Sequence, residues 1–178
     1  MKSDCLIELV GATDKSRTTT VEAVITIEPA APGDLEQLVV LENKLFHEDA
    51  GRHGTYPDLT WPEREAARDF IRLLADPACL VLVARDDTGL VGHLVAYTSA
   101  ATPTRQEVTF AVLRSMYVLT DRRNHGVGNL LADRFLSWAR VRGCVEAQVS
   151  AYVANEGAQR FYQGKGFIGQ SLSLAMPL

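Results

Sequence analysis

The chain has 178 residues, a formal net charge of −4 and a hydrophobic fraction of 47%, and this length suits one domain. So apolar a chain can offset the entropy of ordering, which excludes disorder throughout. The excess of 22 acidic over 18 basic residues argues against a dedicated nucleic-acid binder, because such proteins carry a basic footprint.

The cysteines and the apolar runs predict a cytoplasmic protein. Cys5, Cys79 and Cys144 lie far apart and form no C-x-x-C motif, so neither a disulfide framework nor a zinc site is expected. Glu8 interrupts the short apolar run after Lys2, which excludes a signal peptide. The cysteine pattern therefore gives no reason to expect a metal. No apolar stretch approaches the roughly 18 residues that a membrane span needs, so we expect no membrane partner.

The first part of the chain predicts an appendage followed by a strand and a helix. Residues 11–20 are polar and show no hydrophobic periodicity, so residues 1–20 are expected to be a flexible extension of a domain over 21–178. Residues 21–27 are rich in β-branched side chains and roughly alternate between apolar and polar, which predicts a strand. Apolar spacing predicts a helix over 34–48 that opens on an Asp34–Gln37 capping box; its stripe runs through Leu35, Leu38, Val39, Glu42, Leu45 and Phe46.

The remaining elements predict an α/β domain with a mixed sheet. A loop over 49–59 precedes a second capping box, Thr60 to Glu63, and a helix that ends at Asp76. The other expected elements are strands over 80–84, 90–97, 108–119, 147–153 and 167–176, and helices over 127–142 and 155–165. The predicted order is therefore β-α-α-β-β-β-α-β-α-β.

A glycine-containing loop lies between a predicted strand and a predicted helix, over residues 123–128. Gly126 and Gly128 allow backbone N–H groups to approach an anion, and the helix start adds a positive dipole. The loop lacks the Walker spacing, and Leu131 stands where a Rossmann fingerprint has its third glycine. The pattern predicts a phosphate or pyrophosphate site, although an ordinary strand-to-helix turn fits it as well.

A second motif resolves this ambiguity. Its fixed positions are Asn155, Ala158, Phe161, Tyr162, Gly166 and Phe167. Together with Arg123, Gly126 and Gly128, it closely resembles the GNAT acetyltransferase superfamily, whose members move an acetyl group from acetyl-CoA to an amine. The resemblance implies a single GNAT-like domain over residues 21–178, with a central mixed, mostly antiparallel sheet flanked by helices.

The resemblance also implies which residues bind acetyl-CoA. The loop should bind the pyrophosphate through its backbone, the strand over 116–118 should pair with the pantetheine arm, and the Val118 N–H could polarise the thioester carbonyl. The strand leading to Asn155 should splay from its neighbour. The residues expected to bind acetyl-CoA are Met116, Tyr117, Val118, Arg123, Asn124, His125, Gly126, Val127, Gly128, Asn129, Asn155 and Tyr162.

Two of these positions carry further expectations. Tyr162 is the candidate general acid for the departing thiolate, against the alternative of a core tyrosine whose hydroxyl finds a buried partner. Asn124 and His125 stand where many relatives carry Gly and then Lys or Arg. His125 supplies less charge than Lys at neutral pH, and Arg122 is expected to compensate.

The acceptor side is less well defined. Glu48 and Asp49 end the first helix, where two adjacent acids could attract a cationic amine, and Tyr56 lies in the loop that follows. The alternative is a solvated helix terminus. We predict Tyr162, Asn155 and Glu48 as catalytic, and Glu48, Asp49 and Tyr56 as acceptor-binding. Other candidates for the general base are Glu107 and Ser115, whereas His93 in an apolar strand suits a satisfied core residue.

The resulting prediction is an N-acetyltransferase that acts by direct transfer, in a ternary complex, from acetyl-CoA to a primary amine of a small cationic acceptor. Two alternatives stay open: a CoA-binding regulatory module without turnover, and an acyltransferase that uses a longer acyl-CoA. Many relatives are dimers, so a homodimer is also possible.

Overall fold

The computed structural model describes residues 24–100 and 107–176. The expected extension over 1–20 and the first residues of the expected strand over 21–27 lie outside this described part. None of the helices in the described ranges has the length and apolarity that crossing a bilayer requires.

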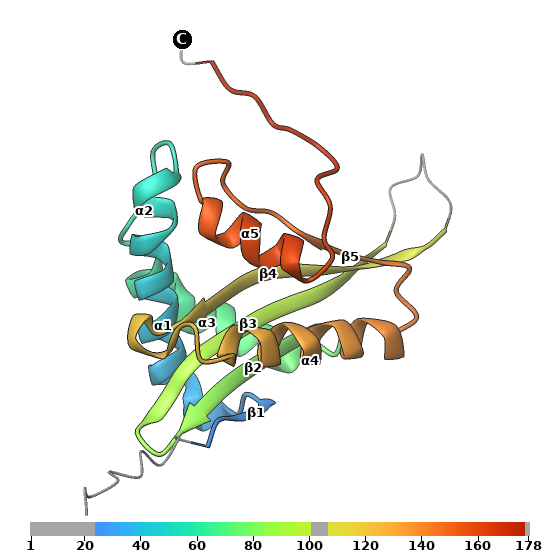
Figure 1. Ribbon diagram of the computed structural model, residues 1–178. Helices are drawn as coiled ribbons and strands as arrows, with labels where there is room; N and C mark the ends of the chain where they lie inside the picture. Colours follow the sequence, from blue (N-terminus) through green and yellow to red (C-terminus); the bar gives the residue numbers. More distant parts are fainter. Residues whose placement is uncertain (1–23, 101–106, 177–178) are drawn as a thin grey trace, which may run out of the picture.

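The centre of the molecule is a five-stranded sheet whose strands lie side by side in chain order (Figure 1). The strands are β1 (Thr26–Pro29), β2 (Cys79–Asp86), β3 (Gly89–Ala100), β4 (Thr109–Val118) and β5 (Glu146–Val149). The first three junctions are antiparallel and the last, between β4 and β5, is parallel. The prediction of one α/β domain with a mixed, mostly antiparallel sheet is confirmed.

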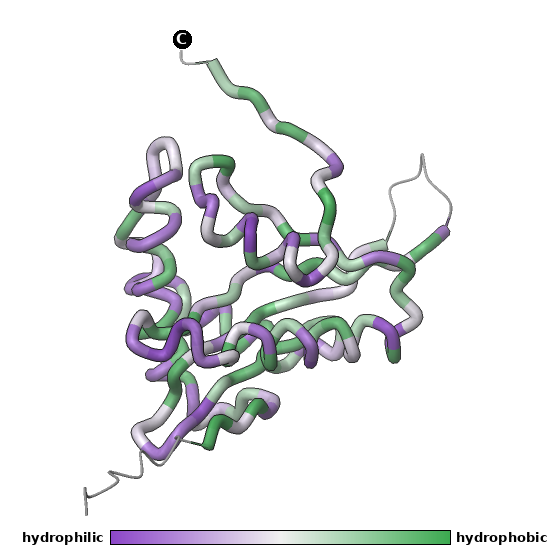
Figure 2. Tube along the Cα trace, in the orientation of Figure 1, coloured by the Kyte–Doolittle hydropathy of each residue, from purple (hydrophilic) through white to green (hydrophobic). Residues whose placement is uncertain are grey.

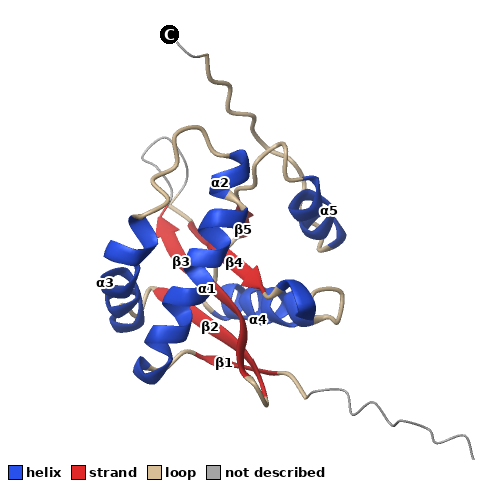
Figure 3. Cartoon of the chain, turned by 90° about the vertical axis from the view of Figure 1, so that its left-hand side faces the viewer, coloured by secondary structure: helices blue, strands red, loops and turns tan. Residues whose placement is uncertain are grey.

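Helices cover both faces of this sheet (Figure 3). They are α1 (Leu35–Glu48), α2 (Ala50–His53), α3 (Trp61–Ala75), α4 (Val127–Val141) and α5 (Glu156–Gly164), with short 3-10 helices at Pro32–Asp34 and Thr120–Arg122. Helix α4 buries Leu131 and Phe135 in one core cluster. Helices α1 and α3 bury Leu38 and Phe70 in another, so each face of the sheet has its own core.

Both predicted capping boxes are wrong. The Asp34 carboxylate turns back to accept from the backbone N–H of Ala31, and Gln37 Oε1 instead accepts from the backbone N–H of Leu90. At α3, Thr60 makes no capping bond, because its backbone N–H and hydroxyl both donate to Asp58. In each case the side chain that the local pattern predicts as a cap makes a hydrogen bond elsewhere, either within a turn or to a distant residue.

The β predictions fail at both ends of the chain. Residues 24 and 25, within the predicted strand over 21–27, are not in a strand, and β1 runs over Thr26–Pro29. The loop predicted over 49–59 contains the helix α2. The predicted final strand over 167–176 is not a strand, since no strand within the described residues pairs with it. The alternating apolar residues are there, but their side chains, including Leu174 at 85%, are exposed.

The sheet opens between β4 and β5, and this opening positions the site. Strand β5 pairs with only Phe110 to Leu113 of β4, so the rest of β4 runs on without that neighbour. The register against β3 also shifts between Leu113 and Ser115, which makes Arg114 the extra residue of a β-bulge. The predicted splaying of these strands is confirmed.

Candidate functional site

A cavity of about 600 Å³ lies where β4 and β5 part. Its walls come from β4, the start of α4, the end of β5 and helix α5. Ten of the twelve residues predicted to bind acetyl-CoA line it: Met116, Tyr117, Val118, Arg123, Asn124, Gly126, Gly128, Asn129, Asn155 and Tyr162. The structure therefore brings together two motifs that lie about thirty residues apart in the sequence.

The glycine loop presents the start of α4 to this cavity. Asn124 and Gly126 both adopt left-handed backbone, with φ of 65° and 82°, and Gly126 is the N-cap of α4. A Cβ on Gly128 would lie 3.4 Å from the Phe161 ring, so the loop packs closely against α5. The unpaired N–H groups of the first helical turn can hold an anion here.

Two predicted residues of this loop do not line the cavity. The Val127 side chain is buried in the core beneath α4, so only its backbone can serve a ligand. His125 is exposed, and its Nδ1 lies 2.8 Å from the carbonyl oxygen of Arg123. Arg122, expected to supply charge in its place, donates to Asp86 and Asp121.

Arg123 is held by Glu48 in a two-pronged ion pair. Its Nη1 and Nη2 donate to the two carboxylate oxygens of Glu48 at 2.6 and 2.9 Å, and its Nε donates to the Val118 carbonyl oxygen at 2.9 Å. The guanidinium also lies over the Tyr117 ring, 5.2 Å from its centroid. The arrangement ties the end of α1 to β4 and to the glycine loop.

This ion pair changes the ionisation of both partners. The hydrogen bonds from Arg123 hold the pKa of the Glu48 carboxyl below its usual value, against the opposing effect of burial. The bond from Glu48 raises the pKa of Arg123. The guanidinium of Arg123 occupies both carboxylate oxygens of Glu48, so neither oxygen faces an incoming proton, which argues against the base role expected for Glu48.

Asn155 connects α5 to the end of α1. Its side-chain Oδ1 accepts from the backbone N–H of Ala158 at 3.0 Å, which caps α5. Its Nδ2 donates to Asp49 Oδ1 at 2.8 Å. The one asparagine therefore fixes both the start of the helix that carries Tyr162 and the position of an acid at the cavity wall.

Tyr162 is mostly buried and lines the same cavity. Its ring packs edge-on against Phe161 and Phe167, with centroids 5.3 and 5.6 Å away. Burial, and then the charge of Asp49, raise the pKa of Tyr162 to about 12. The phenol therefore keeps its proton throughout the neutral range, as a proton donor must.

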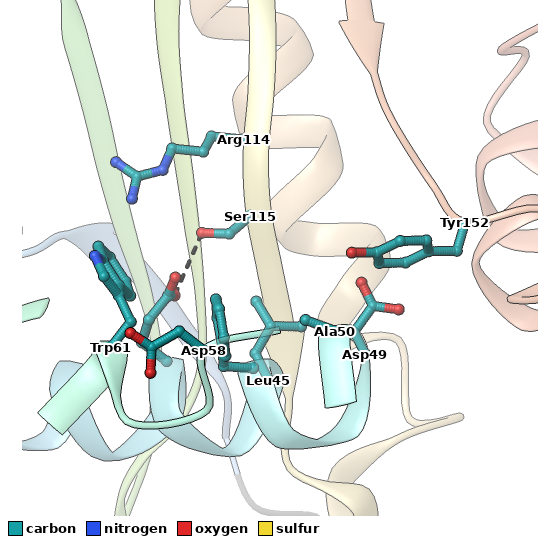
Figure 4. A pocket seen from close by; sticks show the side chains of 10 residues that line it. Leu45, Asp49, Ala50, Asp58, Trp61, Arg114, Ser115 and Tyr152 are labelled. Carbon is teal, nitrogen blue, oxygen red and sulfur yellow. Dashed lines mark hydrogen bonds between the residues drawn. The ribbon is translucent and has the colours of Figure 1, made fainter. Parts of the chain in front are cut away.

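A second cavity of about 480 Å³ lies on the α1 side of β4 (Figure 4). It shares Leu45, Asp49, Arg114 and Ser115 with the first cavity. Trp61 and Asp58 lie on one side of it, and Tyr152 and Asp49 lie on the other, as Figure 4 shows. The two cavities therefore meet along the bulged part of β4.

The residues predicted for the acceptor side agree only in part with the lining of this second cavity. Asp49 lines it as predicted, whereas Tyr56 is 90% exposed and lines neither cavity. Glu107 is exposed as well. Glu42 lines it and was missed, although a charged residue within an apolar helical stripe is a signal that could have identified it.

No group of three or more His, Cys, Asp or Glu side chains in the described ranges is arranged to hold a metal ion.

Comparison with known proteins identifies the family to which the chain belongs. The profile of the family described as "Acetyltransferase (GNAT) family" matches residues 43–167, well over half of the chain. The chain is 29% identical over 115 residues to an aminoglycoside N(6')-acetyltransferase type 1 from Acinetobacter genomosp. 13, covering 61% of this chain and 77% of that protein.

Solved structures share the fold. A variant of the BH1408 protein from Bacillus halodurans superposes with a TM-score of 0.79 at 20% identity, covering 86% of this chain and 99% of that one. The aminoglycoside N-acetyltransferase AAC(6')-Iy, solved in complex with CoA, superposes with a TM-score of 0.73 at 18% identity, covering 90% and 98%.

The ion pair between Glu48 and Arg123 yields a stability prediction. Glu48→Gln is expected to lower stability at pH 7 by about 1–2 kcal/mol, and thus the melting temperature by roughly 3–6 °C. The folded pKa of Glu48 is depressed, so this contribution is present above the unfolded pKa and is lost as the pH falls through the folded one. Thermal unfolding at pH 7 and below pH 4 should therefore show a difference that shrinks in acid.

The matched control is Glu36→Gln, an exposed position on the same helix. It should melt with the wild type at both pH values. Equal melting of Glu48→Gln and the wild type at pH 7 would show that the ion pair contributes nothing.

Proposed function

Because the chain belongs to the GNAT acetyltransferase family, we propose that it transfers the acetyl group of acetyl-CoA to a primary amine of a small cationic acceptor. The observation that carries this proposal is the meeting of two unlike cavities along Arg114 and Ser115 of β4. One offers backbone N–H groups at a helix start, and the other offers carboxylates and aromatic rings.

The larger cavity suits acetyl-CoA. The start of α4 fits a pyrophosphate, since left-handed backbone at Asn124 and Gly126 turns N–H groups toward an anion. The free edge of β4 beyond Leu113 fits the pantetheine arm, because its backbone groups on that side have no β5 partner. Bound acetyl-CoA supplies the activated acetyl group, and the backbone N–H of Val118 is suited to polarise its carbonyl.

The smaller cavity suits a polyamine-like or aminosugar acceptor. Glu42, Asp49 and Asp58 line it together with the rings of Phe46, Trp61 and Tyr152. Carboxylates attract ammonium groups, and aromatic faces bind both cations and sugar rings. The similarity to an aminoglycoside N(6')-acetyltransferase supports the same class of acceptor.

Tyr162 serves as the proton donor to the departing thiolate in this proposal. Its hydroxyl has no hydrogen-bond partner within the described residues, although the ring is firmly packed. The charge of Asp49 contributes to its raised pKa, so a bound ammonium beside Asp49 would lower that pKa and ease the transfer. Glu48 acts here as a brace for Arg123 rather than as a base.

A screen of CoA release tests the function. Wild-type protein is mixed with acetyl-CoA and a panel of aminoglycosides, polyamines, simple alkylamines and amino acids, and free thiol is measured. We expect release with one of the cationic amines. CoA binding without release on any amine would favour a regulatory module, faster release from a longer acyl-CoA would favour another acyl donor, and no CoA binding would refute the proposal.

The Tyr162→Phe variant tests the proton donor. It keeps the ring packing, so CoA affinity measured by calorimetry should stay at the wild-type value. The kcat should fall by about a hundredfold or more, as for other general acids. Because Tyr162 of the free protein titrates only near pH 12, the wild-type kcat/KM should show no alkaline loss from this group below about pH 11. An unchanged kcat would refute the role.

We also propose that the chain forms a homodimer through its C-terminal segment, residues 167–176. Ile168, Leu172, Leu174 and Met176 are 66–85% exposed, and the segment extends away from the body of the molecule with apolar positions along it (Figures 1 and 2). Such a row of apolar side chains is typical of a surface covered by a partner, and a second copy of the chain is the partner we propose.

A double variant tests the dimer. Leu172→Lys with Leu174→Lys should convert a dimer into a monomer in sedimentation or light scattering. The matched control, Ser171→Lys with Ser173→Lys, adds the same charge on the alternate positions and should stay dimeric. A monomeric wild type would refute the proposal.

A further inference from the structure

One carboxylate in the smaller cavity stands apart from the others. Glu42 on α1 is only 7% exposed and still lines that cavity. Its Oε2 lies 2.8 Å from Nε2 of His93 on β3, and Ser115 Oγ on β4 donates to the same oxygen at 3.4 Å. Three elements that are distant in the sequence therefore meet at a single carboxylate oxygen.

Core packing does not account for this group. A buried carboxylate is unfavourable by several kcal/mol unless it is paired and hydrogen-bonded. Its partner His93 is fully buried, and its other ring nitrogen, Nδ1, has no hydrogen-bond partner among the described residues. The edge-on contact of the imidazole with Phe70, at 6.1 Å between ring centroids, is one that an apolar side chain would make equally well. Such an arrangement is typical of a functional site.

The position of Ser115 connects Glu42 to the proposed chemistry. Ser115 follows the bulge at Arg114 and lines both cavities. It also directly precedes the segment over 116–118 expected to hold the thioester. The dashed line from Ser115 in Figure 4 is its contact with Glu42 Oε2. The Ser115 hydroxyl therefore links Glu42 to the part of β4 that both cavities share.

The surrounding charges keep Glu42 ionised. The groups that face it are His93 from β3, Arg114 from β4 and Asp69 from α3. Burial alone would raise the pKa of the Glu42 carboxyl, but His93 and then Arg114 outweigh burial and the charge of Asp69, so the pKa lies below its usual value. A carboxylate is thus available at neutral pH to receive a proton.

We propose that Glu42 is the proton acceptor for the attacking amine, reached through the Ser115 hydroxyl, with His93 as the residue that positions it. This inference rests on the proposed function. The amine nitrogen forms a bond to the acetyl carbon as the carbon–sulfur bond breaks. Before this attack, one proton of the bound ammonium passes to Ser115 Oγ, whose own proton passes to Glu42. The thiolate takes the phenolic proton of Tyr162, and the excess proton on the acylated nitrogen returns to the Tyr162 phenolate.

The variant Glu42→Gln tests this relay with amines of decreasing basicity. On a simple alkylamine, which is an ammonium ion at neutral pH, kcat/KM should fall by about a hundredfold or more. On a weakly basic amine, such as a fluorinated ethylamine that is already neutral at pH 7, the loss should be much smaller. A purely structural role would lower the rate equally on both amines.

Two further variants keep the test decisive. Ser115→Ala, at a half-buried position, should show the same dependence on amine basicity with a smaller loss, and it carries the test if Glu42→Gln fails to fold. Glu36→Gln, exposed on the same helix, should retain wild-type rates on every amine. Thermal unfolding and CoA affinity report whether each variant is intact.

The outcomes separate this inference from the proposed function. If the wild type acetylates no amine, the proposed function fails and the relay fails with it. If the wild type is active while Glu42→Gln keeps full activity, or loses the same factor on every amine, the relay alone is overturned.

Discussion

The short pairing between β4 and β5 is the constraint on which the site depends. Parallel neighbours normally continue side by side, but here they share only the register from Phe110 to Leu113. Beyond that point the backbone of β4 has lost one neighbour, and unpaired backbone groups require either water or a ligand. A cavity of about 600 Å³ occupies the gap, and both motif segments border it. The cavity is therefore a consequence of an interrupted sheet.

The bulge at Arg114 adds the second half of the arrangement. An extra residue in one strand changes which side chains face each side of the sheet. Ser115 consequently lines both cavities, so an electrophile on one side and a nucleophile on the other can meet across a single strand. The two cavities differ in character, because helix dipoles dominate one and carboxylates the other.

The sequence predicted the parts of this arrangement that depend on local pattern. Helices α1, α3 and α4 lie where spacing indicated, and Asn155 and Tyr162 line the larger cavity, as the resemblance to the family implied. The contact of Glu42 with His93 joins residues 51 positions apart, and that of Glu48 with Arg123 joins residues 75 apart, so neither leaves a local signature. The prediction of a final strand was wrong for a related reason. Alternation of apolar and polar residues indicates that a segment has two different faces, but it does not show whether a partner strand lies beside it.

The ion pair of Glu48 with Arg123 also limits the distance over which the glycine loop can attract an anion. Arg122 and Arg123, the cations next to the loop, are both neutralised by carboxylates. Attraction at the start of α4 then comes from fixed backbone dipoles, whose effect falls off within about a turn of the helix. On the proposed function, a nucleotide would therefore be bound at contact distance by the shape of the loop, and the two arginines would contribute little long-range steering of the kind that ionic strength screens.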